Sequence, residues 1–472
     1  MLNLNERTKA KLIEVVGSAN FQDSSEARLV YSYDATPNFQ SLPDAVIMPE
    51  NKEQVKRILT ICNEDHVPIV PRGSGTNLSA GTCPTQGGIV LTFNRMNKIL
   101  EVDEENLTVT VQPGVITLDL INAVEAKGLF YPPDPSSMKI STIGGNINEC
   151  SGGLRGLKYG VTKDYVLGLE VVLANGDCIK TGGKLAKDVA GYDLTNLFVG
   201  SEGTLGVVTE AILKLIPIPE TKQTLLALFE DMDAAAKTVS AIIANKIIPA
   251  TLEFLDQPTC EVVEDFAQVG LPTDVNAVLL IEQDGPPEVV KRDIEMISRI
   301  CSEGNAVSVK VAASQAEAEA LSTARRSALS ALARMKPTTI LEDATVPRSK
   351  ISEMVKAINE IAVTYNVKIC TFGHAGDGNL HPTCLTDARD EEELHRVEQA
   401  FEAIFHKAIE LGGTITGEHG VGEMKAPYLA LKMGGEGVAA MKAIKYALDP
   451  QGIMNPGKIF AKDTRKRVVV RS

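Results

Sequence analysis

Short apolar runs alternate with glycine-rich turns along the first half of the chain, from about residue 44 to residue 217. Runs of about four to eight residues between turn signals are typical of strands, whereas apolar positions three and four apart indicate a helix. Asn175-Gly176 follows one such run, and this dipeptide favours the tight turn of a β-hairpin. We predict strands at 45–49, 67–71, 107–114 and 166–173, and a helix at 52–63.

The pattern changes after Pro217-Ile218-Pro219, where longer elements follow in a repeated order. A strand, a helix and a strand are predicted twice in succession, which favours an antiparallel sheet with helices on one face. A long alanine-rich helix is predicted at 314–335, and helices again from about residue 424. The two repeated units are predicted at 223–229, 231–245 and 251–255, and at 277–282, 286–301 and 306–311.

The length of the chain indicates more than one domain. Its 472 residues exceed the roughly 250–300 that one hydrophobic core usually serves. Pro217 and Pro219 mark the best candidate boundary. We therefore predict three regions, at residues 1–219, 220–423 and 424–472.

Composition narrows the class of protein. An apolar content of 44% excludes general disorder, and a net charge of −14 argues against a nucleic-acid binder. The basic tail at 462–467 is the exception, and a solvated terminus is its simpler interpretation. No run approaches the ~18 apolar residues of a membrane span, and the N-terminus lacks the order of a secretory signal. Eight cysteines without a C-x-x-C pair fit reduced thiols, so we expect a cytoplasmic protein.

Three of the six histidines lie in two glycine-flanked segments near the C-terminus, 373–381 (GHAGDGNLH) and 417–420 (GEHG). Two histidines and a carboxylate can hold a divalent ion, and another histidine beside them can act as a base. A hairpin would place His374 and His381 opposite each other, with Cβ atoms about 5 Å apart. In an extended segment Glu418 and His419 would point opposite ways. The alternative is purely structural, because glycines also permit close packing and unusual backbone angles.

Four further segments are rich in glycine: 71–77, 132–146, 152–160 and 200–209. The first offers backbone N–H groups that could cradle a phosphate. By itself this signal is weak, because Gly73-x-Gly75 lacks the third glycine of a dinucleotide fingerprint and an ordinary turn explains it as well. Together, so many positions without side chains among buried strands imply a large ligand that lies against the backbone.

In order and spacing, these four segments resemble the flavin domain of the vanillyl-alcohol-oxidase superfamily. The histidine segments resemble its branch of FAD-linked D-2-hydroxy-acid dehydrogenases, which includes D-lactate dehydrogenase, the D subunit of glycolate oxidase and D-2-hydroxyglutarate dehydrogenase. The resemblance implies an α+β fold with a two-subdomain FAD-binding domain at 1–219. It further implies a ferredoxin-like cap domain with the metal site at 220–423, and a helical segment at 424–472 that returns to the FAD domain.

The resemblance also implies which residues contact FAD. Relatives with covalent flavin carry a histidine where this chain has Thr76, so we expect noncovalent FAD. The implied cofactor-binding residues are Arg72, Gly73, Ser74, Gly75, Thr76, Asn77, Pro133, Asp134, Ser141, Thr142, Gly144, Gly145, Asn148, Gly152, Gly156, Gly160, Glu202, Gly206, Val208 and Asn455.

By the same resemblance His374, His381 and Glu418 would hold one divalent metal, His419 would be the base and Arg325 would bind the substrate carboxylate. Zinc, iron and manganese all suit two histidines and a carboxylate. The alternative for Arg325 is a charge on a helix surface. Relatives often carry a tryptophan where this chain has Ser322. The dicarboxylate branch carries a lysine where this chain has Leu341-Glu342-Asp343, which favours a small monocarboxylate.

We therefore expect oxidation of D-lactate to pyruvate, with oxidation of glycolate to glyoxylate as the alternative. The sequence offers no iron–sulfur motif, haem site or nicotinamide fold of its own. Electrons must then leave the flavin to an external acceptor. The resemblance implies a redox partner protein, either an electron-transfer flavoprotein, which is slightly favoured, or an iron–sulfur subunit.

Overall fold

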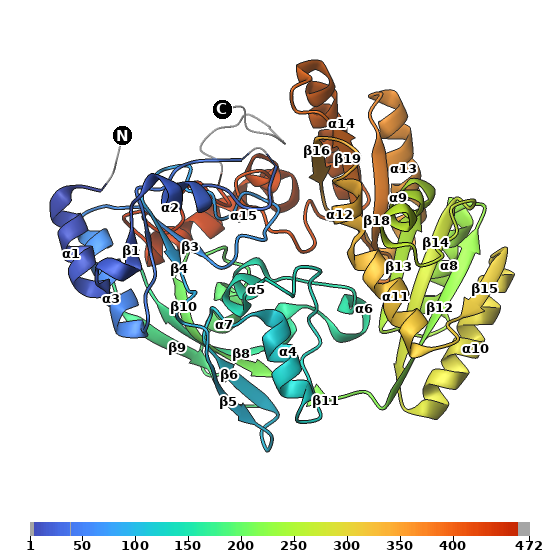
Figure 1. The fold of residues 1–472 in the computed structure, drawn as a ribbon, viewed down its shortest axis with the longest axis horizontal. Helices are drawn as coiled ribbons and strands as arrows, with labels where there is room; N and C mark the ends of the chain where they lie inside the picture. Colours follow the sequence, from blue (N-terminus) through green and yellow to red (C-terminus); the bar gives the residue numbers. More distant parts are fainter. Residues whose placement is uncertain (1–3, 38, 461–472) are drawn as a thin grey trace.

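The computed structural model describes residues 4–37 and 39–460, so the basic tail at 462–467 lies outside the described residues. Two lobes lie side by side (Figure 1). One contains the N-terminal half together with the last helix, and the other contains the large sheet that begins after residue 220.

A small, mostly parallel sheet forms one part of the first lobe, in the order β1-β2-β4-β3. The chain passes from β2 through α3 to β3, and the apolar side of α3 (Val55, Ile58, Leu59 and Cys62) is buried in the core of this region. Asn51 caps α3 by accepting the Gln54 N–H. The elements are α1 (Glu6–Val16), β1 (Phe21–Gln22), α2 (Ser25–Val30), β2 (Ala45–Ile47), α3 (Lys52–Glu64), β3 (Ile69–Arg72) and β4 (Ile89–Thr92).

A five-stranded antiparallel sheet forms the other part of this lobe, in the order β5-β6-β10-β8-β9. The predicted hairpin is confirmed, because β8 pairs with β9 across the Asn175-Gly176 turn, where Gly176 has φ 87°. The elements are β5 (Ile99–Asp103), β6 (Thr108–Val111), α4 (Thr117–Glu125), β7 (Leu129–Phe130), α5 (Ile143–Glu149), α6 (Gly156–Tyr159), β8 (Val166–Val172), β9 (Cys178–Gly182), α7 (Leu194–Phe198), β10 (Val207–Lys214) and β11 (Ile216–Pro217).

The second lobe is built on one eight-stranded sheet, with β15-β12-β14-β13-β18-β19-β16 side by side and β17 paired to β19. Its first four strands have the antiparallel order expected of a ferredoxin-like unit, so both predicted strand–helix–strand units are present. The continuation from β16 to α14 repeats the strand–helix–strand–strand–helix order. The elements are β12 (Thr221–Phe229), α8 (Met232–Ala244), β13 (Thr251–Asp256), α9 (Gln257–Ala267), β14 (Ala277–Gly285), α10 (Pro287–Glu303), β15 (Ser308–Val311), α11 (Gln315–Arg326), α12 (Ala328–Leu332), β16 (Thr338–Leu341), β17 (Ala344–Thr345), α13 (Ile351–Thr364), β18 (Ile369–His374), β19 (Asn379–Thr386) and α14 (Glu391–Glu410).

The two faces of this sheet have different cores. Side chains of α8, α10, α13 and α14 share one apolar cluster with one face, whereas α9, α11 and α12 pack against the other. The single helix predicted at 314–335 is wrong, since α11 ends at Arg326 and α12 starts at Ala328. The Ser327 hydroxyl donates to the Ala324 carbonyl at the break, a local bond that competes with the helical ladder.

The C-terminal segment packs on the first lobe. After α15 (Leu429–Leu448), Met454 forms a parallel bridge with Ile69, and the Asn455 N–H donates to the Ile69 carbonyl at 2.7 Å.

Within the described residues, no helix is both long and apolar enough to cross a membrane.

Candidate active site and cofactor cavity

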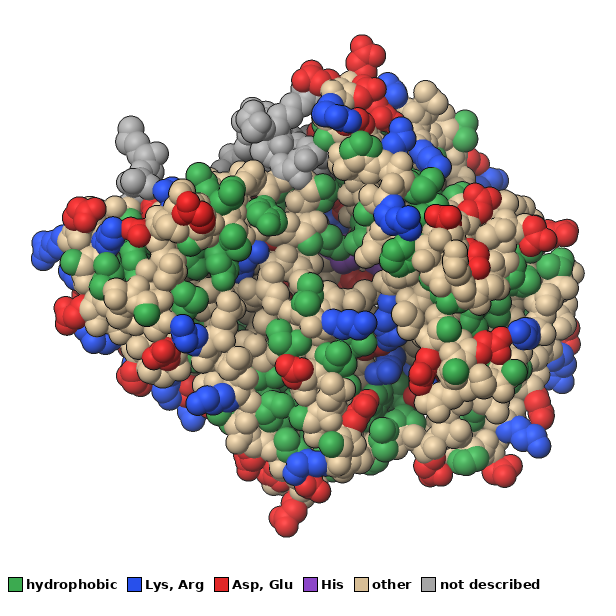
Figure 2. Space-filling model, viewed as in Figure 1, with side chains coloured by type: hydrophobic (Ala, Val, Ile, Leu, Met, Phe, Trp, Pro, Cys, Tyr) green, Lys and Arg blue, Asp and Glu red, His purple; other side chains and the backbone are tan. Residues whose placement is uncertain are grey.

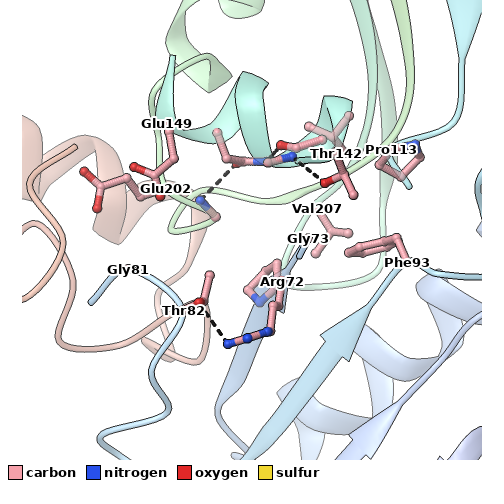
Figure 3. A pocket seen from close by; sticks show the side chains of 16 residues that line it. Arg72, Gly73, Gly81, Thr82, Phe93, Pro113, Thr142, Glu149, Glu202 and Val207 are labelled. Carbon is pink, nitrogen blue, oxygen red and sulfur yellow. Dashed lines mark hydrogen bonds between the residues drawn. The ribbon is translucent and has the colours of Figure 1, made fainter. Parts of the chain in front are cut away.

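A cavity, here called the cofactor cavity, lies where β3, α5 and the start of β10 meet (Figure 3). Glu149 and Glu202 lie at one end of the view and Phe93 and Pro113 at the other. The cavity is lined by Pro71, Arg72, Gly73, Gly81, Thr82, Phe93, Pro113, Thr142, Gly144, Gly145, Asn148, Glu149, Glu202, Gly203, Val207 and Val208.

Glycines make this cavity possible by allowing backbone segments to approach closely. A Cβ at Gly73 would lie 2.2 Å from Thr142 Oγ1, and one at Gly144 would lie 2.6 Å from the Pro113 Cβ. Gly75 has φ 71°, and a Cβ there would lie 2.1 Å from the guanidinium of Arg72. That guanidinium is itself held by the Tyr33 carbonyl at 2.7 Å. Larger residues would therefore displace the loop that borders the cavity.

Three side chains from two separate parts of the chain converge beside the large sheet, and we call them the ligand cluster: His374, His381 and Glu418. The Nε2 atoms of both histidines lie 3.2 Å from Glu418 Oε1. His374 ends β18, and His381 lies in β19. The expectation that the two histidines oppose each other is wrong: His381 faces Phe372 and His374 faces Asn379. They are diagonal neighbours on one face, and their ring centroids are 5.1 Å apart.

Glu253 orients the His374 ring through its Nδ1 atom, on the side away from Glu418. Its carboxylate lies 2.8 Å from Nδ1 of His374, which leaves Nε2 directed at Glu418. Glu253 has no exposed surface, and its other oxygen lies 2.6 Å from Arg325. Such a carboxylate fixes the tautomer and the ring orientation of a metal-binding histidine. Glu253 was not among the predicted site residues, although a glutamate inside a predicted strand can signal a special role.

Asp343 positions the loop that carries Glu418 and His419. One of its oxygens accepts the N–H groups of Gly417, Glu418 and His419 at 2.8–3.1 Å, and the Thr416 hydroxyl at 2.9 Å. Burial opposes the charge, yet His419 and Lys425 hold the pKa of this carboxyl well below its usual range. Asp343 was not among the predicted site residues, and nothing local in the sequence indicated this role.

His419 lies parallel to His381, with ring centroids 5.1 Å apart and an interplanar angle of 14°. Its Nε2 lies 4.0 Å from Glu418 Oε1, and its Nδ1 lies 3.8 Å from Asp343. Burial lowers the pKa of His419 to about 4, against the opposing effect of Asp343. The neutral imidazole can therefore accept a proton at pH 7.

Two family models match this chain. Residues 43–182 match an FAD binding domain, and residues 218–459 match the C-terminal domain of FAD linked oxidases. The chain belongs to the FAD-linked oxidases. It is 74% identical over 466 residues to a Bacillus subtilis protein named glycolate oxidase subunit GlcD, covering 99% of both chains.

Relatives of lower identity are named either glycolate oxidase subunit GlcD or D-lactate dehydrogenase. The Escherichia coli glycolate oxidase subunit GlcD is 37% identical over 447 residues, covering 95% of this chain and 89% of that one. A D-lactate dehydrogenase of Anaerostipes hadrus is 36% identical over 430 residues, covering 89% and 90%. The predicted membership in the branch of D-lactate dehydrogenases and glycolate oxidase D subunits within the vanillyl-alcohol-oxidase superfamily is confirmed.

Solved structures confirm the predicted fold class. p-Cresol methylhydroxylase with substrate bound has a TM-score of 0.81 at 19% identity, with 96% of both chains covered. A 4-ethylphenol oxidase from Gulosibacter chungangensis has a TM-score of 0.75 at 20% identity, with 98% of this chain and 99% of that one covered. At such low identity the likeness concerns the fold alone, which is the α+β, vanillyl-alcohol-oxidase type.

The predicted FAD contacts of this oxidase fall into two groups. Eight line the cofactor cavity: Arg72, Gly73, Thr142, Gly144, Gly145, Asn148, Glu202 and Val208. The others do not line it: Ser74, Gly75, Thr76, Asn77, Pro133, Asp134, Ser141, Gly152, Gly156, Gly160, Gly206 and Asn455. Asn455 nevertheless joins two parts of the wall, because its side-chain amide donates to the carbonyls of Gly81 and Glu202 at 2.9 and 2.7 Å.

Several of the predicted FAD contacts that do not line the cofactor cavity face the second lobe. A Cβ at Gly152 would lie 2.4 Å from the Glu418 carboxylate, and one at Gly156 would lie 2.6 Å from Asp377. The carboxylate of Asp134 pairs with Arg326. These glycines therefore bring the first lobe into contact with the ligand cluster. Figure 2 shows a hollow between the two lobes, with histidine side chains deep inside it.

The buried acid Glu202 connects the cofactor cavity to the loop of His419. Glu202 accepts the N–H groups of Val421 and Gly422, each at 2.7 Å. Burial raises the pKa of Glu202 to about 7. Burial and the neighbouring Glu202 raise the pKa of Glu149 as well. The sequence analysis did not single out Glu149, and no pattern around position 149 distinguished it from a helix-surface glutamate.

Arg325 is 3% exposed, so the alternative of a charge on a helix surface is wrong. The guanidinium lies over the Phe372 ring, 4.8 Å from its centroid, and one nitrogen pairs with Glu253. Its Nε is buried and donates to no described residue. A buried guanidinium with a free donor can bind a carboxylate.

Proposed function

We propose that this protein oxidises small D-2-hydroxy acids, with D-lactate as the leading substrate. The observation that carries this proposal is the convergence of His374, His381 and Glu418 within 3.2 Å contacts, with a neutral histidine stacked beside them. Two imidazole nitrogens and a carboxylate oxygen directed at one point are a suitable donor set for a divalent ion. Zinc, iron and manganese all remain compatible with this set.

The residues present also fit noncovalent FAD. The cofactor cavity is walled by glycine backbone from three separate segments, which leaves room for a ligand to approach main-chain groups. Thr76 stands where relatives with covalent flavin carry a histidine. When bound, FAD supplies a two-electron acceptor, and a divalent ion in the ligand cluster supplies a Lewis acid for the substrate hydroxyl.

Each residue then has a definite task in the reaction. The free Nε donor of Arg325 would bind the substrate carboxylate. His374, His381 and Glu418 would hold a divalent ion beside the substrate hydroxyl. Nε2 of His419 accepts the hydroxyl proton, and Asp343 beside Nδ1 stabilises the imidazolium that forms. D-Lactate would lose this proton to His419, and FAD held in the cofactor cavity would supply the acceptor for the hydride from Cα, which would leave pyruvate.

A second candidate is oxidation of glycolate to glyoxylate. The observation in its favour is the 74% identity to a protein named glycolate oxidase subunit. Glycolate and D-lactate share the carboxylate and the hydroxyl that Arg325 and the ligand cluster would contact. They differ only in the substituent on Cα.

We further propose a redox partner protein, because FAD reduced by the substrate must pass two electrons onward. The name of the Bacillus relative describes it as a subunit, which supports association with other chains. The partner would be an electron-transfer flavoprotein or an iron–sulfur subunit, with the former slightly favoured. A cytoplasmic location remains our prediction, and the eight unpaired cysteines are consistent with a reducing compartment.

Anaerobic reduction of the bound flavin tests the proposal. The purified protein, as isolated with its flavin and metal, is mixed with D-lactate, L-lactate, glycolate or D-2-hydroxyglutarate. We expect bleaching of the flavin absorption by D-lactate and glycolate, and far slower bleaching by L-lactate and D-2-hydroxyglutarate. A flavin that no 2-hydroxy acid bleaches would contradict the proposed function.

A further inference from the structure

Glu149 lines the cofactor cavity and has no task in the proposed reaction. It is the last residue of α5, and Cys150 turns the chain away from the helix with φ 54°. The Oε2 atom of Glu149 is buried and forms no hydrogen bond with any described residue. A buried carboxyl oxygen without a partner costs free energy, so its place in the wall points to a ligand group that completes the hydrogen bond.

A second acid, Glu202, lies beside Glu149 at the loop of His419. Figure 3 shows the two carboxylates directed toward each other at one end of the cofactor cavity. A Cβ at Gly420 would lie 2.2 Å from Glu149 Oε2 and 3.2 Å from Glu202 Oε1, so both oxygens face the same glycine. Like charges this close together in a buried wall repel each other strongly, which favours one proton on the pair at neutral pH.

The hydrogen bonds of the pair assign this proton to Glu149. Both oxygens of Glu202 accept backbone N–H groups, from Val421 and Gly422, each at 2.7 Å. Such donors stabilise the charged form of a carboxyl group. Glu149 Oε2 accepts none from the described residues. Glu202 is therefore the better anion and Glu149 the better acid.

The charged groups around the pair support the same assignment. Burial, together with Glu202 and Asp34, raises the pKa of Glu149 well above its ordinary value, and Lys425 acts in the opposite direction. Burial raises the pKa of Glu202 only to about 7, because Lys458 and Lys425 join its N–H donors in lowering it. Glu149 thus holds its proton more firmly than Glu202 does.

This end of the cofactor cavity is the end that adjoins the ligand cluster. Glu202 is bonded to the loop that carries Glu418 and His419. Gly152, three residues after Glu149, lies against the Glu418 carboxylate. The flavin ring has to reach the substrate carbon to accept its hydride, so the ring belongs at this end of the cavity.

We propose that Glu149 carries a proton at neutral pH and donates a hydrogen bond to the flavin ring of bound FAD, with Glu202 as its anionic neighbour. Reduction brings two electrons to that ring. A neutral donor stabilises the added negative charge, whereas a carboxylate would oppose it. Glu149 therefore makes the bound flavin easier to reduce. The inference rests on the proposed function for the end of the cavity at which the ring lies.

Potentiometric titration of the purified holoprotein with dithionite tests the inference. Flavin absorption, read against a reference dye, gives the equilibrium constant for reduction. Glu149→Leu removes the donor, so we expect this constant to fall at least about tenfold, the contribution of one hydrogen bond to a charged group. Glu149→Gln keeps an N–H donor and should stay within about threefold of wild type. Glu125→Gln, on an exposed position of α4, should change nothing.

The two variants at position 149 also define the results that overturn the inference. A Glu149→Leu constant within about threefold of wild type would show that Glu149 does not contact the flavin ring. A Glu149→Gln constant at least about tenfold above wild type would show that Glu149 is charged, because the amide would have removed an opposing charge. If Glu149→Leu loses its flavin and Glu149→Gln keeps it, the hydrogen bond is supported. Loss of flavin from both variants overturns it.

Because dithionite replaces the substrate, the outcome is distinct from that of the proposed function. A flavin that titrates as expected but that no 2-hydroxy acid bleaches would keep this inference and defeat the proposed substrate class.

Infrared spectroscopy detects the proton directly. The difference spectrum between reduced and oxidised holoprotein should contain a carboxylic-acid carbonyl band that shifts in deuterated water. This band should be absent from Glu149→Gln and retained in Glu125→Gln. A wild-type spectrum without the band, or a Glu149→Gln spectrum that keeps it, would overturn the protonated state of Glu149.

Discussion

The cofactor cavity is formed mainly by backbone, whereas the ligand cluster is formed by ionisable side chains. In the cofactor cavity, glycines remove side chains so that segments far apart in the sequence approach through their backbones. In the ligand cluster, ionisable side chains are buried against one another, and two of the three are held by a further acid: Glu253 lies behind His374, and Asp343 lies behind the loop of Glu418. The first region depends on shape and the second on charge balance.

This difference predicts how each region fails. Adding atoms should damage the cofactor cavity, whereas removing a charged or polar group should damage the ligand cluster. The two kinds of failure are separable because the flavin and the metal can be quantified independently.

The largest effect is expected for Gly75→Val, which should abolish FAD retention. The new side chain would meet the Arg72 guanidinium, and valine is strained at φ 71°. Flavin absorption of the purified protein measures the loss. Gly128→Val is the matched control, because Gly128 has φ 73° but its Cβ would meet no described atom within 4 Å. Equal flavin loss in both variants would assign the effect to backbone strain and not to the cavity.

The next effect is expected for His374→Ala, which should remove the metal but leave FAD bound. Loss of one of three proposed ligands, together with a Glu253 carboxylate that keeps only Arg325 as its partner, should slow flavin reduction by D-lactate by about 10³. Metal analysis and absorption spectra of the same sample measure both cofactors. His395→Ala is the control, since His395 is 66% exposed on α14. A variant that keeps the metal would contradict the role of His374 as a ligand.

Sequence alone predicted the shape-dependent region less completely than the charge-dependent one. The spacing of glycines located the walls of the cofactor cavity, but not which residues line it: Phe93, Pro113 and Glu149 were missed. Cavity walls depend on where loops from several strands meet, and no local pattern records that. The three members of the ligand cluster were singled out because histidines flanked by glycines are rare. The structure brings them together, and their role as metal ligands stays a prediction.

The two acids that hold the ligand cluster, Glu253 and Asp343, were not predicted, for a different reason. Glu253 in β13 and Asp343, between β16 and β17, lie 90 residues apart in the numbering. Their roles exist only once these elements and the loop of His419 are assembled. The sheet order explains why: β13 and β18 are neighbours although α9 to α13 separate them in the chain. The break between α11 and α12 was missed because a serine in an alanine-rich helix is an ordinary residue.

His419→Asn should keep the metal and the flavin but slow flavin reduction by about 10²–10⁴, which is the usual contribution of a positioned base. Asparagine retains a polar group beside Asp343 but cannot accept the proton. Stopped-flow reduction at saturating D-lactate measures the effect. His406→Asn, on an exposed position of α14, serves as the control. A His419→Asn rate within a few-fold of wild type would place the base elsewhere.

The smallest effect is expected for Arg325→Lys. This variant decides whether Arg325 contacts the substrate or instead positions Glu253 behind His374. Lysine keeps the charge beside Glu253 but loses the planar fork that binds a carboxylate through two N–H groups. If Arg325 contacts substrate, KM for D-lactate should rise about tenfold while metal content and the saturated rate change little. If instead it acts by fixing Glu253 behind His374, metal content should fall and the saturated rate with it. Arg299→Lys, at a side chain 65% exposed, is the matched control and should change none of these quantities.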